Sequence, residues 1–526
     1  MKRLTVSASL LAIVTVVGLI HAAGNPIART DAGTLSGVTD SLGVTSYKGI
    51  PFGAPPVGNL RWQAPQPVAH WTGIRKADHF GQACYQNEAH SRLPWTEPFM
   101  EQGPVGEDCL YLNVWTAAKS ARERRPVMVF MYGGGFNEGA GSIAVYDGTQ
   151  LATRGVVLVN LNYRVGPLGF LVYPELTKES EHGSSGNYGL LDQIAALEWV
   201  HKNIAAFGGD PNRVTIFGQS AGAISVYDLM QSPLAKGLFV RAIAESGPGL
   251  IGGAGRGNQP TLADREQAGV RWAEAKGAHS LADLRALSPA DTLASTGRGG
   301  PPAPNSPVAD GWVIPAPGTP PIPDQVPLLL GMVADDIGTT SAGTQAPTLA
   351  SFTDAAKAKY GAKADDFYKL YAPASDSDVP AMQKAAGRDQ GRVSIALWSA
   401  NQLKLSPKIY TYFFDRPIPW PEHREFQAFH TSDVPYIFEN LAMLDRPWEP
   451  VDHQVSQAMS SYWVNFATTG DPNGKGLANW PAYAAEANQT MELGPKMGPM
   501  PLAATPERVA FQTDFLQQPP KPPAGR

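Results

Sequence analysis

The sequence predicts an α/β protein built on one large, mostly parallel sheet with helices on both faces. Apolar segments of strand length recur along the chain, and several are continuous rather than alternating, which is typical of strands covered on both sides. A helical segment over residues 190–206 lies between two of them, so helices and strands alternate. In such a sheet, functional groups lie on loops at the carboxyl ends of the strands. The strand-like segments are residues 127–132, 156–163, 214–217, 240–244, 326–333 and 408–414.

The composition is that of a globular chain with a large core. Of 526 residues, 43% are hydrophobic and 17% are charged, which excludes a disordered chain or a charged fibre. There are 42 basic and 47 acidic residues and no long basic run, so no nucleic acid is expected as a partner. The length alone allows several domains, but large α/β enzymes often keep one sheet, and we favour a single domain.

The first 22 residues have the pattern of a secretory signal peptide. Lys2 and Arg3 precede an apolar run over residues 4–20, and small residues follow at Ala22 and Ala23. An uncleaved anchor is the alternative, but the run is short for a span of about 20 residues. We therefore expect a secreted or periplasmic mature domain over residues 23–526, with no membrane span.

Cys84 and Cys109 are the only two cysteines of the chain. In an exported protein, an even pair most simply closes one disulfide, whereas two buried free thiols are the alternative. Further along, the composition changes over residues 247–327, where glycine and proline clusters surround helical patterns at 266–276 and 281–287. This segment is predicted to be an insertion over the sheet rather than a separate domain.

The clearest chemical signal is G-x-S-x-G at residues 218–222, between the strand-like segment 214–217 and a helical segment at 223–230. A sharp strand-to-helix turn in this context exposes the central serine, and small flanking residues let the two elements approach closely. Ser220 is therefore the candidate nucleophile, with the Ala221 amide facing the position of an oxyanion. An ordinary glycine turn is the alternative.

A second group of backbone donors is predicted after residues 127–132, where three consecutive glycines precede Phe136. Glycines leave backbone amides uncovered, so Gly134 and Gly135 can point at the oxyanion beside Ala221. This loop precedes the nucleophile, as it does in enzymes with a nucleophile elbow. A flexible surface loop is the alternative.

The base and its orienting acid are expected downstream in the order Ser, acid, His. Of the three downstream histidines, His423 and His453 lie in segments typical of a surface, whereas His430 lies between Phe429 and an aromatic segment. His430 is therefore the candidate base. The strand-like segment 326–333 runs into Asp335 and Asp336, and one of them would orient the imidazole. Spacing alone does not choose between the two carboxylates.

Longer segments around these positions resemble the type-B carboxylesterases, a group of cholinesterase-like α/β-hydrolases. Residues 207–222 resemble the serine signature of that family. Residues 107–115 resemble its second signature, and the only departure from that signature follows them, at Ala117. The likeness extends over about residues 26–500 and is weakest near 250–305. Shorter matches lie at residues 162–166, 189–193 and 462–473.

The resemblance implies an α/β-hydrolase fold and hydrolysis of carboxylic esters. Acyl transfer through the candidate serine requires no cofactor, and no metal is implied because no H-E-x-x-H, paired C-x-x-C or EF-hand spacing appears. In the family's motif the second acid is catalytic, which favours Asp336 over Asp335. The implied triad is Ser220, Asp336 and His430. The resemblance also implies a Cys84–Cys109 disulfide and structural ion pairs of Arg61 with Glu107 and Arg164 with Asp192.

Besides Ala117, three positions depart from the family pattern: Gln219 and Asp336 stand where Glu is usual, and Ile337 stands where Gly is usual. Gln219 removes a charge beside the nucleophile, which could change the preference for cationic substrates. The Asp336 side chain is one methylene shorter than that of Glu, so the contact between Asp336 and His430 is the one in the triad that the shorter side chain makes hardest to form.

The sequence thus predicts an exported serine carboxylesterase acting on a small-molecule ester. A non-catalytic binding module and an amidase or lactonase with the same triad are the alternatives. The substrate is left open among simple aryl or alkyl, feruloyl-like and polycarboxylate toxin esters, and the oligomeric state is not specified. Pocket walls are expected from loops 87–105 and 247–307, with Trp95, Phe99, Phe136 and Trp312 as candidate lining residues.

Overall fold

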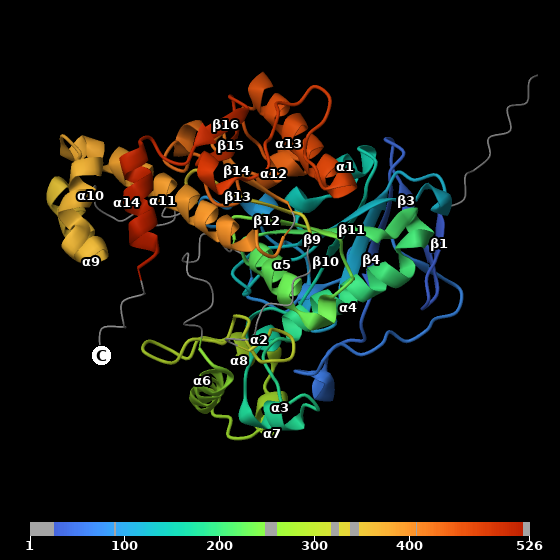
Figure 1. Cartoon of the computed structure of the whole chain (residues 1–526). Helices are drawn as coiled ribbons and strands as arrows, with labels where there is room; N and C mark the ends of the chain where they lie inside the picture. The colour runs from blue at the N-terminus through green and yellow to red at the C-terminus, as the bar shows by residue number, and fades with distance from the viewer. Residues whose placement is uncertain are drawn as a thin grey trace, which may run out of the picture.

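A single sheet of eleven strands organises the computed structural model, which describes residues 26–88, 91–247, 260–316, 326–336, 347–406 and 408–518 (Figure 1). The strand order is β16-β15-β14-β13-β12-β11-β9-β10-β8-β4-β3. The strands are β3 (Val38–Thr39), β4 (Thr45–Pro51), β8 (Tyr111–Thr116), β9 (Arg125–Met131), β10 (Val157–Leu161), β11 (Gly209–Gln219), β12 (Arg241–Glu245), β13 (Leu328–Val333), β14 (Ile409–Phe414), β15 (Gln489–Leu493) and β16 (Gly498–Pro501).

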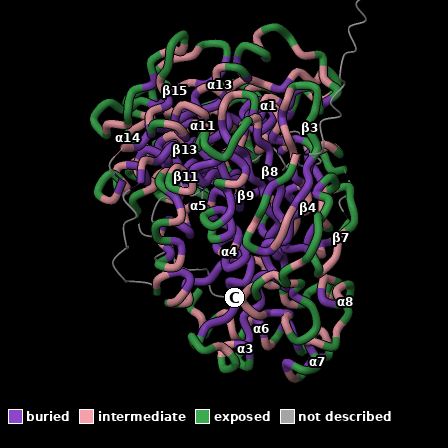
Figure 2. Tube along the Cα trace, turned by 90° about the vertical axis from the view of Figure 1, so that its right-hand side faces the viewer, coloured by how far each residue is buried: buried purple, intermediate pink, exposed green. Residues whose placement is uncertain are grey.

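The six predicted strand segments form β9 to β14, which are consecutive neighbours in the parallel centre of this sheet. Every residue of β10, β13 and β14 is buried, which explains why their apolar runs are continuous. Strand β11 begins well before the predicted residue 214, because Gly209 pairs with Arg125 of β9 ahead of an irregularity in register. Figure 2 shows the buried residues concentrated in these central strands and the exposed ones in the peripheral loops.

Helices cover both faces of the sheet, as predicted. Figure 1 shows α1 (Thr149–Thr153) and α13 (Pro450–Thr469) on one side and α4 (Tyr188–Asn203) and α5 (Ala221–Gln231) on the other. The predicted helix over 190–206 is α4 followed by a 3-10 turn over Ile204–Phe207, and Gly208 ends it with a left-handed φ of 82°.

The remaining helices form two peripheral groups. The described part of the 247–327 segment carries α6, α7 and α8, and the first two lie close to the predicted helical patterns. Helices α9, α10 and α14 lie at the left of Figure 1 beside α11, which also packs on β13 and β14. Aromatic side chains around Phe367 form a separate small core there. The bounds are α2 (Gly166–Phe170), α3 (Pro174–Glu179), α6 (Leu262–Ala275), α7 (Leu281–Ala286), α8 (Pro289–Leu293), α9 (Leu349–Tyr360), α10 (Ala364–Tyr371), α11 (Val379–Gln402), α12 (Val434–Ile437) and α14 (Pro506–Leu516).

The N-terminal part is held by small sheets and by covalent and ionic contacts. Cys84 and Cys109 form a disulfide, as the resemblance implied. Both implied ion pairs are present, with N–O distances of 2.7 Å for Arg61–Glu107 and for Arg164–Asp192. The small sheets comprise β1 (Ile27–Arg29), β2 (Thr34–Ser36) and β5 (Ile74–Lys76), and β6 (Ala83–Cys84) with β7 (Val105–Gly106).

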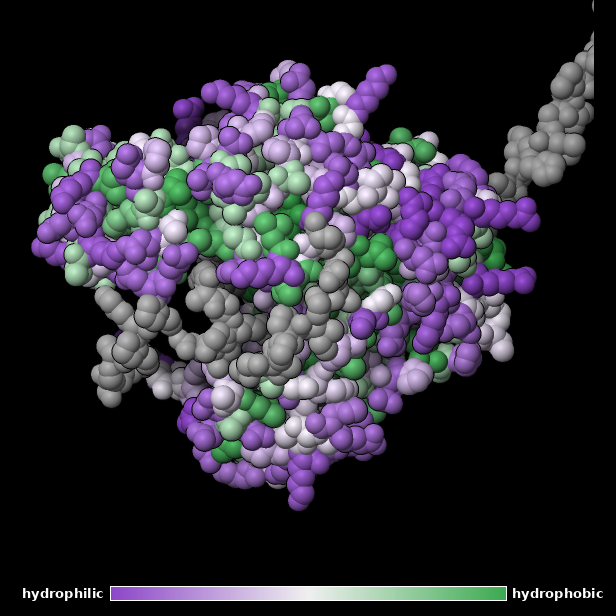
Figure 3. All heavy atoms as spheres, in the orientation of Figure 1, coloured by the Kyte–Doolittle hydropathy of each residue, from purple (hydrophilic) through white to green (hydrophobic). Residues whose placement is uncertain are grey.

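The face of the molecule drawn in Figure 3 carries polar side chains with apolar ones between them. Figure 3 shows hydrophilic side chains spread over most of the face in view. Within the described ranges, no helix combines the length and the apolar character needed to cross a membrane. The predicted signal peptide, residues 1–22, lies outside the described residues, as does Ile337.

Candidate active site

Ser220 lies at the sharp turn between β11 and α5, as the G-x-S-x-G context predicted. Its backbone has φ 58° and ψ −121°, a conformation that costs a non-glycine residue about 1–3 kcal/mol. The turn is held because the Ser220 N–H donates to the Glu245 carbonyl at 2.8 Å and the Ile224 N–H donates to the Ser220 carbonyl at 3.0 Å. A side chain at Gly222 would collide with the Met131 carbonyl oxygen of β9, so only glycine fits there.

The glycine loop after β9 lies against this turn. A Cβ on Gly133 would be 3.0 Å from the Ser220 Cβ. Gly134 and Gly135 have φ values of 97° and 62°, in the left-handed region that favours glycine. Among the described residues, no hydrogen bond uses the N–H of Gly134 or Gly135, and both glycines line the cavity that contains Ser220. The loop therefore offers two free donors beside the serine.

Asp336 and His430 meet at the carboxyl end of the sheet, so the shorter carboxylate does reach the imidazole. The His430 Nδ1 and Asp336 Oδ1 atoms are hydrogen-bonded. The second carboxylate oxygen of Asp336 accepts a bond from the Val333 N–H at 3.3 Å. Asp336 is only 1% exposed, whereas His430 keeps 23% exposure on its cavity side. This arrangement holds the proton on Nδ1 and turns Nε2 toward the cavity.

Asp335 points the other way, toward α11. Its carboxylate lies 2.9 Å from the Arg388 guanidinium and 3.4 Å from Lys384 Nζ. Its backbone N–H donates to the Ala428 carbonyl at 2.9 Å, which ties the end of β13 to the segment leading to His430. The geometry therefore separates the two carboxylates that spacing alone left equivalent.

The other two downstream histidines do not approach this site. The His423 ring lies 3.0 Å from the Glu425 carboxylate, and His453 is exposed on α13. His430 lines the same cavity as Ser220, but no hydrogen bond joins its ring to the serine hydroxyl in the part of the chain that the structure describes. The His430 Nε2 atom instead lies 3.2 Å from Gln219 Nε2.

Two further buried carboxylates, which no sequence motif marked, are linked to this site: the charge of Asp433 acts on His430, and Asp433 in turn acts on Glu245. Asp433 accepts a hydrogen bond from the Tyr412 hydroxyl at 2.8 Å, and Glu245 accepts one from Trp463 Nε1 at 2.7 Å. Burial, together with the charge of Asp433, raises the pKa of Glu245 well above its usual range. Burial also raises the pKa of Asp433 to about 6.

The pKa of His430 results from opposing effects. Burial lowers it, but the charge of Asp336, the hydrogen bond to Asp336 and the charge of Asp433 together outweigh burial. The net effect raises the pKa above the ordinary value of 6.5. The neutral imidazole, which is the form that can act as a base, therefore becomes available at a higher pH than for an ordinary histidine.

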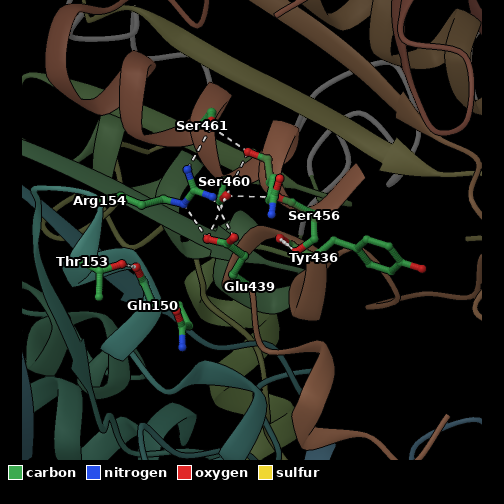
Figure 4. A network of polar contacts seen from close by, with 9 residues as sticks. Gln150, Thr153, Arg154, Tyr436, Glu439, Ser456, Ser460 and Ser461 are labelled. Carbon is green, nitrogen blue, oxygen red and sulfur yellow. Dashed lines mark hydrogen bonds and ion pairs between the residues drawn. The ribbon is translucent and has the colours of Figure 1, made fainter. Parts of the chain in front are cut away.

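The segment after His430 is anchored to two helices, as Figure 4 shows. Arg154 at the end of α1 donates to the Glu439 carboxylate at 2.7 Å and to the Ser461 hydroxyl of α13 at 3.0 Å. The Ser456 hydroxyl of α13 donates to the Tyr436 carbonyl at 2.9 Å. These contacts fix α12, which starts directly after Asp433 and close to the imidazole.

The cavity above Ser220 and His430 has a volume of about 720 Å³. Trp95 and Phe99 line it, as expected, and Trp95 Nε1 donates to the Thr431 hydroxyl at 2.8 Å. Phe136 is instead buried against Phe170, and Trp312 stacks on His182, outside the lining. The charged lining residues, which the sequence analysis did not single out, are Glu88, Arg92, Glu101 and Glu138, and Arg92 and Glu138 form an ion pair.

No group of three or more His, Cys, Asp and Glu residues within the described ranges is arranged to hold a metal ion. The groups that the fold brings together at the site are a serine, an imidazole–carboxylate pair and backbone amides. This set can attack and stabilise a carbonyl centre.

Comparisons with known proteins place the chain among esterases. The model of a family described as "Carboxylesterase family" matches residues 24–512. The chain is 36% identical to fumonisin B1 esterase of Sphingopyxis macrogoltabida, with 90% of this chain and 87% of the relative covered. It is 35% identical to para-nitrobenzyl esterase of Bacillus subtilis, with 89% of this chain and 94% of the relative covered. It is 33% identical to human bile salt-activated lipase, with 93% of this chain and 68% of the relative covered.

Solved structures support the same assignment of the fold. A structure of PNB esterase superimposes with a TM-score of 0.72 at 31% identity and covers 94% of this chain and 100% of the solved one. A second structure of PNB esterase gives a TM-score of 0.73 at 29% identity. Together with the mostly parallel sheet, these likenesses confirm the predicted α/β-hydrolase fold.

Proposed function

The chain belongs to the carboxylesterase family and is a carboxylic ester hydrolase, and we propose that it works through a covalent acyl-enzyme on Ser220. The observation that carries this proposal is the His430–Asp336 hydrogen bond beside a cavity that also contains Ser220 and the free Gly134 and Gly135 amides. These are the parts that serine-dependent acyl transfer requires.

In the proposed reaction, the Ser220 Oγ attacks the ester carbonyl carbon while His430 Nε2 takes its proton. The charge on the carbonyl oxygen is stabilised by the amides of Gly134, Gly135 and Ala221. The intermediate collapses, His430 returns the proton to the leaving alcohol, and an acyl-serine remains. A water molecule, deprotonated by His430, then releases the acid and restores Ser220. Asp336 holds the imidazole in the required tautomer throughout.

The resting contact of His430 Nε2 with Gln219 does not exclude this reaction. Catalytic hydrogen bonds are often absent or long before the substrate binds, and both side chains already face the same cavity. The proposed reaction requires the Ser220 hydroxyl group and His430 Nε2 to come into hydrogen-bond contact within this cavity.

The decisive experiment combines Ser220→Ala with mass spectrometry. Ser220→Ala is expected to abolish hydrolysis of 4-nitrophenyl acetate, and the wild type is expected to carry one acyl group on Ser220 after rapid quenching. Ser225→Ala, in the same helix α5 but outside the cavity lining, is the matched control and should keep turnover. Hydrolysis by a correctly folded Ser220→Ala variant at the rate of the wild type would contradict the proposal.

We further propose that residues 1–22 direct export and that the mature chain starts near Ala23. The Cys84–Cys109 disulfide supports this, because disulfides persist mainly in oxidising compartments. The N-terminal sequence of protein recovered from the periplasm or medium tests it. A deletion of residues 1–22 should leave the chain in the cytoplasm, and export of that deletion variant would refute the assignment.

The substrate class is proposed from the cavity. A volume of about 720 Å³ lies within the range of small-molecule sites, so we propose esters with one moderately large acyl or alcohol group. The names of the relatives add para-nitrobenzyl esters and fumonisin B1 to the simple aryl, feruloyl-like and polycarboxylate esters to be assayed. Matched amides and lactones in the same assay separate esterase from amidase or lactonase activity.

A further inference from the structure

Gln219 makes a contact that its position beside the nucleophile does not require. It is the last residue of β11 and is fully buried, yet it lines the active-site cavity. Its Nε2 atom lies 3.2 Å from His430 Nε2, the ring atom that must exchange a proton with Ser220. Its Oε1 atom is also buried and has no hydrogen-bond partner among the described residues. A buried carboxamide with one unpaired oxygen costs free energy, which calls for a functional explanation.

The two protonation states of His430 can account for both the contact of Gln219 Nε2 and the unpaired Gln219 Oε1. In the resting state the proton is on Nδ1, which faces Asp336, so Nε2 presents a lone pair that accepts from the Gln219 amide group. After Nε2 takes the serine proton, it becomes a donor and needs an acceptor. Rotation of the carboxamide by half a turn presents Oε1 to Nε2, and the oxygen then gains a partner.

We propose that Gln219 is a positioning residue whose neutral carboxamide orients His430 through Nε2, as a donor to the imidazole and as an acceptor from the imidazolium. The proposal rests on the function proposed above, in which His430 is the base. A carboxylate at this position, as in relatives with Glu, could only accept and would also add a negative charge beside the ring. Gln219 therefore lets this chain hold the base without favouring its charged form.

The other groups around the imidazole stay constant in the test. Asp336 follows β13, Asp433 precedes α12, Glu245 ends β12 and Tyr412 belongs to β14. On the cavity side, the lining also contains the charged residues Glu88, Arg92, Glu101 and Glu138. These groups are the same in the wild type and in the Gln219 variants, so a difference in their pH profiles reports the change at Gln219.

The test compares Gln219→Glu and Gln219→Met with the wild type over a pH series. In Gln219→Glu, the added carboxylate should move the acid limb of kcat/KM upward by about one pH unit or more. Gln219→Met keeps the side-chain volume but removes both hydrogen bonds. It should lower kcat about tenfold or more with little change in KM, while its acid limb moves less than that of Gln219→Glu. Gln454→Glu, which adds the same charge to an exposed position of α13, should leave the profile unchanged.

A second readout avoids the substrate. The rate of Ser220 inactivation by phenylmethylsulfonyl fluoride should show the same upward shift in Gln219→Glu. An unmoved acid limb in Gln219→Glu, or a wild-type kcat in Gln219→Met, would overturn the inference. If the wild-type Ser220 is not modified by the reagent, the proposed function fails. If it is modified and the Gln219 variants behave as the wild type, only the role of Gln219 fails. Should Gln219→Glu not fold, the kcat of Gln219→Met decides.

Discussion

At the scale of single residues, adjacent side chains of the same chemistry have different surroundings. Asp335 and Asp336 differ by one position, yet one carboxylate faces the Arg388 guanidinium and the other faces the His430 ring. Gln219 and Ser220 are also adjacent, and both line the cavity. The backbone direction at the end of a strand therefore decides which of two neighbours can take part in chemistry.

Matched substitutions of the two aspartates test this assignment. Asp336→Asn should lower kcat by about 10³- to 10⁴-fold, because the imidazole loses the acceptor that fixes its tautomer. Asp335→Asn should keep kcat within about tenfold but lower the free energy of unfolding by about 1–3 kcal/mol, since Arg388 and Lys384 lose a buried partner. Steady-state kinetics and urea unfolding measure the two effects. A larger loss of kcat in Asp335→Asn than in Asp336→Asn would reverse the assignment.

Asp433 is predicted to contribute to the pH dependence of activity if His430 is the base, as proposed. Its charge, like that of Asp336, raises the pKa of His430, and the free base is lost when pH falls below that pKa. Asp433→Asn removes the charge and keeps an oxygen that can accept from Tyr412. The acid limb of kcat/KM in Asp433→Asn should therefore lie at lower pH than in the wild type. An upward shift would show that the charge of Asp433 does not act on the base.

At the scale of elements, the site depends on how closely β9, β11 and α5 approach one another. Gly222, the second residue of α5, lies against the Met131 carbonyl, and the strained Ser220 backbone is held by β12 through the Glu245 carbonyl. On the other side of the site, Arg154 of α1 and the serines of α13 anchor the segment that follows His430. Ser220 is thus held by the strands β9 and β12, whereas the segment that follows His430 is held by contacts with Arg154 and α13.

A pair of glycine substitutions tests the close approach. Gly222→Ala should lower the free energy of unfolding by about 1–3 kcal/mol and reduce activity, because the added methyl group meets the Met131 carbonyl. Gly387→Ala in α11 is the control, since a Cβ there meets no atom within 4 Å. It should stabilise the chain by about 0.5–1 kcal/mol through its higher helix propensity. Equal effects of the two substitutions on urea unfolding would argue against the packing explanation.

At the scale of the whole molecule, the disulfide joins β6 to the segment before β8, near the loop that contributes to the cavity wall. Its two sulfur atoms connect residues separated by 25 positions. The double variant Cys84→Ala/Cys109→Ala should lose about 2–5 kcal/mol of unfolding free energy. Calorimetry compares the melting temperature of this variant with that of the wild type, which is measured with and without reductant. A melting temperature equal to that of the oxidised wild type would contradict a stabilising role.

Much of the fold was predictable because its signals are local. Continuous apolar runs marked β9 to β14, and the glycines around Ser220 marked the turn. The prediction was less accurate where pairing partners decide the bounds, as at the early start of β11. Among the candidate lining residues, Trp95 and Phe99 reach the cavity, but Phe136 and Trp312 pack elsewhere, since an aromatic side chain suits a core as well as a pocket.

By itself, the sequence determined the strand-to-helix turn at Ser220 and the glycine loop, because neighbours along the chain specify these features. It also determined the order in which the glycine loop, the serine, the acid and the histidine follow one another along the chain. The family resemblance already favoured Asp336 over Asp335, and the tertiary structure shows the contact of Asp336 with His430. Only the tertiary structure revealed that Gln219 contacts His430 Nε2 and that the buried Asp433 acts on the ring. Those contacts join segments that are far apart in sequence. Their distances follow from how the sheet and its helices pack, which no local pattern encodes.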